Sequence, residues 1–294
     1  RLRWWMGYPL VVPEKIRARL AAVAEMKNSH VVRSNLRKTL SSIYDLERLA
    51  GRVALRVATP RDLIALKSSL AVLPQLQAML TDFTALSLVK IRQEMTDMST
   101  LVDLLSRAIV ADPPPRTQDG GFIASGFDDG LDQLRSISRD GKKWIAALEA
   151  KERQATGINS LKIGFNNVFG YYIEVTKANA PLVPDSYVRK QTLVNAERYI
   201  NQELKEFEQT VLGAEEKIRE RENEIFNQLR NDLMPYIADI QYNAFRVAEL
   251  DAFCALAEVA EKYSYVCPEI DEEDVISIKD GRHPVVEAVL KNEG

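Results

Sequence analysis

Residues 155–200 hold a group of side chains whose chemistry suits contact with phosphate oxygens. The segment has five basic and three acidic residues, a net charge of +2 in a protein whose total is −3. The bases are Lys162, Lys177, Arg189, Lys190 and Arg198, and the acids are Glu174, Asp185 and Glu197. Interleaved with them are Asn166, Asn167, Tyr187, Gln191, Thr192 and Asn195. This mixture favours sequence-independent contact with a nucleic-acid backbone, and the alternative is an ordinary solvated surface with turn-forming asparagines.

Elsewhere, the motifs that could carry catalysis are incomplete. Gly141 and Lys142 resemble part of a phosphate-binding loop, but Ser136 stands where that loop needs glycine and Lys143 where it needs Ser or Thr. The acidic stretches "GFDDG" and "PEIDEEDVISI" lack the alternating oxygen ligands of a calcium loop. His30 and His283 have no His or Cys nearby, which favours structural roles. We therefore expect no active site, metal or cofactor within these residues.

Composition is that of a globular protein of 294 residues, 46% hydrophobic and 28% charged. The overall charge gives no basic signature, so any nucleic-acid binding must come from a local patch. Cys254 and Cys267 are too few for a disulfide framework. No apolar run approaches the length of a membrane span, and the start lacks a signal peptide. A cytoplasmic location without membrane contact is the expectation.

The elements that position these residues are mostly helices. Apolar residues recur at helical spacing over residues 12–80, where Pro13 suits a helix start and Thr59 suits an N-cap before Pro60. The predicted apolar stripe of the second of these helices consists of Leu63, Leu66, Leu70 and Leu73. Another helix is predicted over residues 94–110, ended by the prolines at 113–115. Together these patterns indicate a helix-on-helix core.

A glycine-dense stretch at residues 119–130 leads into a predicted helix over about 131–154. After Gly157 the apolar period changes from 3.6 to 2, which indicates strands: a hairpin over residues 161–176 with a turn near Asn166, and a third strand at about 190–199. Helical spacing returns from Gln202 to Tyr263, with Asn201 as candidate N-cap. The sequence therefore predicts a mainly α protein, in which two long antiparallel helices carry a small inserted antiparallel sheet.

The stretch "TGINSLKIGFNNVFGYYIEVTKANAPLVPDSYVRKQTLVNAERYINQELKEFE" resembles the clamp region of the MutS family of bacterial mismatch-recognition proteins. Likeness to the family's core is carried by "YDLERLAGRVALRVATPRDLIALKSSLAVLPQL" and "DGGFIASGFDDGLDQLR". "VAELDAFCALAEVAEKYSYVCPEI" is similar to the returning lever, and "IKDGRHPVVEAVL" to the entry of the ATPase domain. Several long motifs in the family's order carry this resemblance.

The resemblance implies a division into a core with an ascending lever (1–154), a clamp (155–200), a returning lever with core (201–264) and the entry to an ATPase domain (265–294). The family's dimers encircle duplex DNA, mismatched DNA included, and work with a MutL-type repair partner. Their P-loop domain uses ATP and Mg, and the sequence ends at Gly294 before any such motif. By this resemblance, ATP hydrolysis is expected of the parent protein and not of these residues.

Carried over by position, the clamp's DNA contacts correspond to Asn166, Lys190 and Asn195, with Arg189 and Thr192 as second choices. Val194 stands where many relatives have Lys, which removes one candidate phosphate contact. Many relatives also have proline at the second helix entrance, where this chain has Asn201 followed by Gln202. The alternative function is a helical scaffold whose inserted sheet binds a protein partner; a free-standing enzyme would need a site that the sequence lacks.

Overall fold

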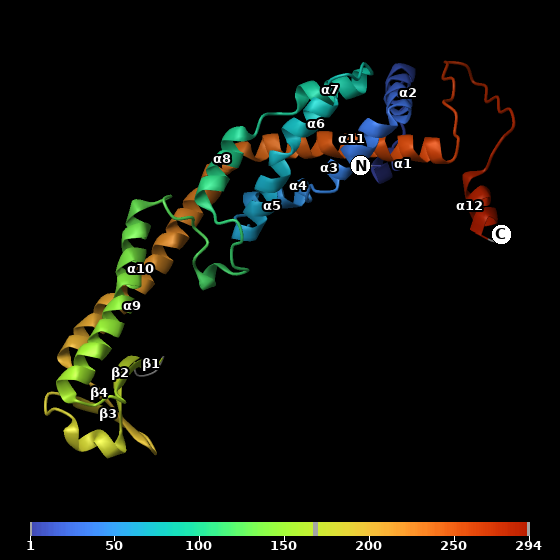
Figure 1. Cartoon of the computed structure of the whole chain (residues 1–294). Helices are drawn as coiled ribbons and strands as arrows, with labels where there is room; N and C mark the ends of the chain where they lie inside the picture. Colours follow the sequence, from blue (N-terminus) through green and yellow to red (C-terminus); the bar gives the residue numbers. More distant parts are fainter. Residues whose placement is uncertain (1, 167–169, 293–294) are drawn as a thin grey trace. The chain divides into compact units, whose positions relative to one another are not determined.

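The computed structural model describes residues 2–166 and 170–292 (Figure 1). The chain forms two compact units, the first made of residues 1–40, 75–95 and 245–294, and the second of residues 41–74 and 96–244. In the described part, the fold is mainly α-helical with one four-stranded antiparallel sheet between two long helices. The predicted fold class is confirmed.

The first unit consists of helices, and a stretch of 21 residues (263–283) without helix or strand connects the last two. Its helices are α1 (Leu2–Gly7), α2 (Pro13–Asn28), α3 (His30–Leu40), α7 (Leu86–Glu94) and α12 (Pro284–Asn292), with the parts of α6 (Leu73–Met79) and α11 (Ile237–Lys262) that belong to it. Pro13 occupies the first position of α2, as predicted. The Glu25 carboxylate accepts the N–H groups of Thr84 and Ala85, both at 2.8 Å, and so fixes the start of α7 against α2.

The helical core of the second unit contains α4 (Leu46–Ala54), α5 (Pro60–Ala71) and α8 (Ser99–Ala108). Thr59 caps α5 in a reciprocal capping box with Asp62, which confirms the predicted start. The predicted apolar stripe of Leu63, Leu66, Leu70 and Leu73 is buried throughout. These side chains exclude water from the contact between α5 and α8.

The predicted helix over residues 94–110 is wrong in its first turn, because α7 ends at Glu94 and α8 begins at Ser99. The buried Asn243 amide accepts the N–H of Thr96 at 2.9 Å and donates to its carbonyl at 3.0 Å. With both backbone groups bonded to a distant side chain, Thr96 has no need of helical hydrogen bonds. Periodicity alone cannot detect such a long-range contact.

Two long antiparallel helices lie side by side and carry the sheet at their ends (Figure 1). They are α9 (Asp129–Thr156) and α10 (Gln202–Asp232), and the short turn η3 (Met234–Tyr236) separates α10 from α11. Asn201 accepts the N–H of Leu204 at 2.8 Å, so the predicted N-cap of α10 is confirmed. The rings of Trp144 and Phe207 stack at 4.1 Å and join the two helices near the sheet.

The sheet has the strand order β1-β2-β4-β3. Its strands are β1 (Lys162–Asn166), β2 (Gly170–Thr176), β3 (Val188–Thr192) and β4 (Ala196–Ile200), with the short helix η2 (Lys177–Leu182) after β2. The predicted hairpin is confirmed, but the single strand predicted over residues 190–199 is two strands. A turn at residues 193–195 separates them, closed by the Leu193 N–H bond to the Ala196 carbonyl at 2.8 Å. That turn contains neither glycine nor proline, the residues that most clearly mark turns in a sequence, so the sequence did not predict it.

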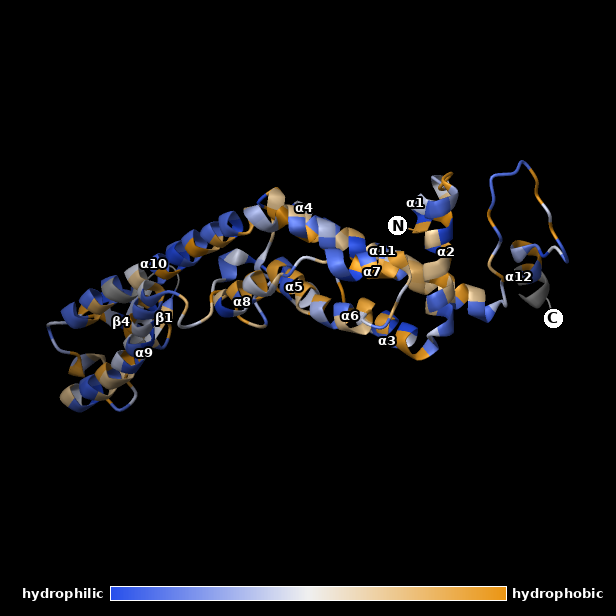
Figure 2. Ribbon diagram, turned by 90° about the horizontal axis from the view of Figure 1, so that it is seen from above, coloured by the Kyte–Doolittle hydropathy of each residue, from blue (hydrophilic) through white to orange (hydrophobic). Residues whose placement is uncertain are grey.

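One face of the sheet packs on the ends of α9 and α10. Ile173, Val175 and Tyr199 from the strands share a buried cluster with Leu148 of α9 and Leu204 of α10. Further from the sheet, α10 is largely hydrophilic along its exposed surface (Figure 2). A small sheet is stable when its hydrophobic face is covered or packs against a helix, and the contact with Leu148 and Leu204 supplies that cover.

Gly170 is predicted to tolerate no side chain. Its φ is +73°, and an added Cβ would lie 1.5 Å from the Glu208 carboxylate oxygen that accepts the Tyr171 N–H. We expect Gly170→Ala to lower the free energy of unfolding by roughly 2–4 kcal/mol, measured by urea denaturation. Gly213→Ala is the matched control, because Gly213 is a helical residue of α10 with nothing near its Cβ position; it should stabilise by about 0.5–1 kcal/mol. Equal urea midpoints for Gly170→Ala and the unsubstituted chain would contradict the prediction that Gly170 tolerates no side chain.

Candidate nucleic-acid interface

The five residues predicted to contact DNA do not lie together: Asn166 is at one end of the sheet, Thr192 and Asn195 are at the other, and Arg189 and Lys190 lie along β3. Asn166 ends β1 opposite Gly170, at the start of β2. The other end of β2, Thr176, pairs with Ala196, next to the turn that contains Asn195. Seven strand residues span roughly 20 Å, so Asn166 and Asn195 do not form one site. Asn167, also singled out in the sequence, lies outside the described residues.

The turn between β3 and β4 is the better candidate of the two. Thr192, Val194 and Asn195 are all exposed there, with Val194 85% exposed. The Asn195 carbonyl accepts the N–H of Lys177 at 3.2 Å, which places an exposed lysine beside the turn. We call Lys177, Thr192, Val194 and Asn195 the tip cluster. Lys177 was not among the predicted contacts, because its place there depends on the pairing of β2 with β4.

Arg189 and Lys190 lie on β3 and are both engaged with carboxylates. Arg189 is 3.6 Å from Glu197, and Lys190 is 3.9 Å from Glu208 of α10. The register of β3 against β4 shifts between residues 189 and 191, so Lys190 is the extra residue of a bulge. The net charge of +2 counted from residues 155–200 therefore overstates the positive field, because Glu208 also contacts the sheet.

The open face of the sheet is occupied by interactions among its own residues. Arg198 donates to Glu174 at 2.9 Å and to Gln191 at 3.0 Å, and its guanidinium lies 4.0 Å from the centre of the Tyr172 ring. The Tyr172 ring also covers Gly164, where a Cβ would come within 2.7 Å of it. Within the described residues, Lys162 and Lys177 are the bases of residues 155–200 that form no ion pair.

Tyr171 belongs to the packed side of the sheet. Its ring is 5.9 Å from Phe207 and 4.9 Å from Phe165, and burial together with the charges of nearby glutamates raises its pKa. Tyr171 packs against Phe207 and Phe165, and Tyr172 lies between Arg198 and Gly164, so neither offers a platform for base stacking. The polar groups of the tip cluster are thus the available contacts.

Three carboxylates from the long helices fasten the sheet. Glu149 of α9 accepts the N–H of Ile163 at 2.8 Å, and Glu208 of α10 accepts that of Tyr171 at 3.0 Å. Glu152, 8% exposed, accepts the Tyr187 hydroxyl at 2.5 Å and the Asn201 amide at 3.0 Å. Burial and the bonded Glu152 carboxylate raise the pKa of Tyr187 well above its ordinary value. The tip cluster is therefore held on a firmly attached scaffold.

The remaining sequence candidates have structural explanations. Gly141 and Lys143 lie inside α9, so they form no phosphate-binding loop. His283 accepts the N–H of Val286 at the start of α12. Cys254 is buried, which raises its pKa to about 12, and Cys267 is exposed; neither is in a disulfide. Among the described residues, no three His, Cys, Asp or Glu side chains gather as a metal site, and no helix could cross a membrane.

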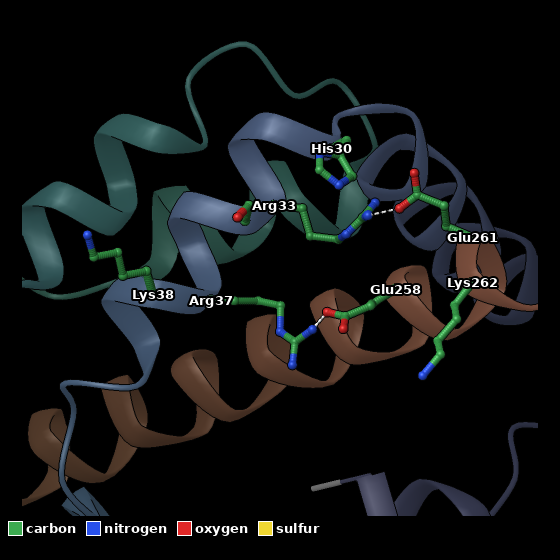
Figure 3. A pocket seen from close by; sticks show the side chains of 8 residues that line it. His30, Arg33, Arg37, Lys38, Glu258, Glu261 and Lys262 are labelled. Atoms are coloured by element: carbon green, nitrogen blue, oxygen red, sulfur yellow. Dashed lines mark hydrogen bonds and ion pairs between the residues drawn. The ribbon is translucent and has the colours of Figure 1, made fainter.

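A polar pocket of about 570 Å³ lies in the first unit between α3 and α11 (Figure 3). Arg33 pairs there with Glu261, and Arg37 pairs with Glu258. Arg33 is buried and also donates to the carbonyl of Met26 at 2.8 Å, near the end of α2. His30, Ser34, Lys38 and Lys262 complete the lining. With its two arginines paired to carboxylates of α11, the pocket joins α3 to α11.

Comparison of the sequence with known proteins identifies the family of the chain. The family model described as MutS domain III matches residues 1–257. The chain belongs to the MutS family. It is 48% identical over 292 residues to the DNA mismatch repair protein MutS of Acetivibrio thermocellus, covering 99% of this chain and 34% of that protein.

Two further MutS relatives give the same result. The DNA mismatch repair protein MutS of Symbiobacterium thermophilum is 47% identical over 290 residues, covering 99% of this chain and 33% of the relative. The protein of the same name from Caldanaerobacter subterraneus is 46% identical over 288 residues, covering 98% and 33%. The chain thus spans about a third of the length of the MutS proteins it matches.

Glu152 is predicted to be the most important of the fastening carboxylates. Glu152→Ala leaves the Tyr187 hydroxyl and the Asn201 amide without their acceptor, so we expect the free energy of unfolding to fall by about 2–4 kcal/mol. Lys151→Ala, next in sequence but exposed, should change it by less than about 1 kcal/mol. Chemical denaturation of both variants measures the difference, and similar losses would argue against a special role for Glu152.

Proposed function

We propose that this chain forms the core and the DNA-contacting clamp of a MutS-type mismatch-repair protein. The observation that carries the proposal is the tip cluster: exposed polar side chains and a lysine that forms no ion pair with any described residue, at one end of a sheet fastened to two long helices. Such groups bond phosphate oxygens without reading base edges. The clamp is therefore proposed to hold duplex DNA irrespective of sequence.

A cluster with so little charge binds duplex weakly on its own. Phosphate contacts gain free energy by releasing counterions, so the affinity of the chain for DNA should fall steeply as salt rises. Encirclement of the duplex by two copies would add the second set of contacts that one cluster lacks. A preference of this chain for a mispair, or an affinity insensitive to salt, would count against the proposal.

The wider roles are proposals that rest on the family. The parent protein is proposed to be a homodimer that binds mismatched duplex DNA, hydrolyses ATP with Mg outside these residues, and acts with a MutL-type partner in the bacterial cytoplasm. Residues 1–154 and 201–264 then supply core and levers, residues 155–200 the clamp, and residues 265–294 the connection to the ATPase domain. The levers would transmit changes between the DNA and that domain.

Loss of charge at the tip cluster is the first test. We expect Lys177→Glu to weaken binding of the chain to a short duplex about tenfold at low salt and to reduce the salt slope by about one unit, measured by fluorescence anisotropy. Lys205→Glu is the matched control, because Lys205 is exposed on α10 outside the sheet. Equal losses in both variants would indicate a general effect of charge.

Gain of charge at Val194 is the second test. Val194→Lys places an ammonium group within the tip cluster, so duplex affinity should rise roughly threefold to tenfold, with a salt slope steeper by about one. Val188→Lys is the matched control, since Val188 is 65% exposed at the opposite end of β3. The same anisotropy titration measures both variants. An equal gain at both positions would refute a localised contact.

These two variants also separate DNA binding from the alternative of a protein-binding sheet. If Lys177→Glu and Val194→Lys both leave duplex affinity unchanged, a protein partner becomes the better proposal. Reversing Arg189 and Lys190 is a less specific test, because it would also place like charges against Glu197 and Glu208 and disturb the sheet. The tip variants avoid this problem, since in the described residues Lys177 has no acidic partner.

A further inference from the structure

The glycine-rich loop before α9 has no part in the proposed DNA contact, yet it meets a buried carboxylate of α10. Glu222 is 1% exposed and accepts the N–H of Gly121 at 2.7 Å and the Arg135 guanidinium of α9 at 2.6 Å. A carboxylate this deeply buried is costly unless its oxygens are fully bonded. Glu222 therefore joins three segments at one point: the loop, α9 and α10.

Arg135 and its neighbour Asp132 hold the rest of the loop. Arg135 also donates to the carbonyl of Ile123 at 2.8 Å. Asp132 lies 3.4 Å from Arg135 and accepts the N–H of Gly126 at 2.6 Å. The loop is thus bonded at residues 121, 123 and 126, all to side chains of α9 or α10.

A second ion pair lies beside the first. Arg221 of α10 donates twice to the carboxylate of Asp128, at 3.1 and 2.7 Å. Asp128 is also the N-cap of α9, since it accepts the N–H of Leu131 at 2.8 Å. The hydrogen bonds from Arg221 and Leu131 lower the pKa of Asp128. Two consecutive residues of α10 therefore hold the base of α9. Arg221 binds Asp128, which precedes α9, and Glu222 binds Arg135, which lies in the second turn of α9.

The loop backbone itself depends on glycine. Gly120, Gly121 and Gly126 all have positive φ, and a Cβ on Gly120 would lie 3.2 Å from the Glu222 carboxylate. The glycines allow the close approach that brings the Gly121 N–H to Glu222. The "DGG" stretch thus serves this contact, and Gly126 of the "SGF" stretch serves the neighbouring bond to Asp132.

The two long helices are anchored differently in the second unit. Beyond Glu222, α10 continues without a break: Phe226 packs against Phe122 with ring centres 5.3 Å apart, and Arg230 donates to the Ala58 carbonyl at 2.6 Å. Helix α9 instead begins at Asp129, directly after the loop. The ion pairs of Glu222 and Arg221 hold its base to α10, and Leu131 in its first turn is fully buried.

We propose that Glu222 and Arg135 are positioning residues for the DNA-contacting sheet: they make α9 and α10 move as one body, so that the direction of α10 sets the place of the tip cluster. This inference rests on the proposed function. Without the contact, the base of α9 is freed and the sheet samples more orientations. Binding DNA must then order those orientations, at a cost in affinity.

The test compares the same substitution in two ion pairs that both join α9 to α10. Glu222→Gln weakens the buried contact, whereas Glu203→Gln breaks the exposed pair of Glu203 with Lys151 near the sheet. Hydrogen exchange of the folded chain should become faster in residues 120–135 for Glu222→Gln alone. Duplex affinity, measured well below the unfolding temperature, should fall about threefold to tenfold for Glu222→Gln and stay unchanged for Glu203→Gln.

Arg135 supplies a graded second measurement, which also serves if Glu222→Gln fails to fold. Arg135→Met removes the charge, whereas Arg135→Lys retains one that can reach Glu222. Duplex affinity should therefore be highest for the unsubstituted chain, lower for Arg135→Lys and lowest for Arg135→Met. Faster exchange at residues 120–135 with unchanged affinity would overturn the inference, because the contact would then be only structural. If Lys177→Glu and Val194→Lys change affinity while these variants do not, the proposed function stands and this inference fails.

Discussion

Attachment of the sheet to the ends of α9 and α10, by apolar packing and by three carboxylates, is the interaction on which the candidate interface depends. A small sheet is stable when its hydrophobic face packs against a helix, and α9 and α10 supply both that apolar surface and acceptors for strand N–H and hydroxyl groups. Glu152 accepts hydrogen bonds from both Tyr187 and Asn201, the N-cap of α10. The same carboxylate therefore stabilises the sheet and the start of α10. Loss of either would remove the support of the other.

The same carboxylates limit where an anion can approach. Glu208 contacts Gly170, Tyr171 and Lys190, so the sheet end that holds Asn166 lies near negative charge. A carboxylate repels a phosphate most strongly where water screens the two charges least. The tip cluster is at the other end, where no fastening carboxylate contacts it. The Glu208 contacts and the exposed polar groups of the tip cluster therefore lie at opposite ends of one small sheet.

Sequence reasoning succeeded where the signal is local and failed where it is long-range. The caps Thr59 and Asn201 and the change of period after Gly157 are visible in neighbouring residues, and each is confirmed. The break at Thr96 depends on an amide 147 residues away, and the place of Lys177 depends on the pairing of β2 with β4. The family resemblance named candidate residues but could not show that they lie at two ends of the sheet.

The bulge at Lys190 also bears on aggregation. Strands β1 and β3 are the edges of the sheet, and an edge strand offers unpaired backbone groups to any other extended chain. A bulge twists such an edge and interrupts its flat row of donors and acceptors, while the charges of Arg189 and Lys190 repel a second copy of the same strand. Lys190 therefore helps to keep neighbouring molecules from joining edge to edge, whatever it contributes to binding DNA.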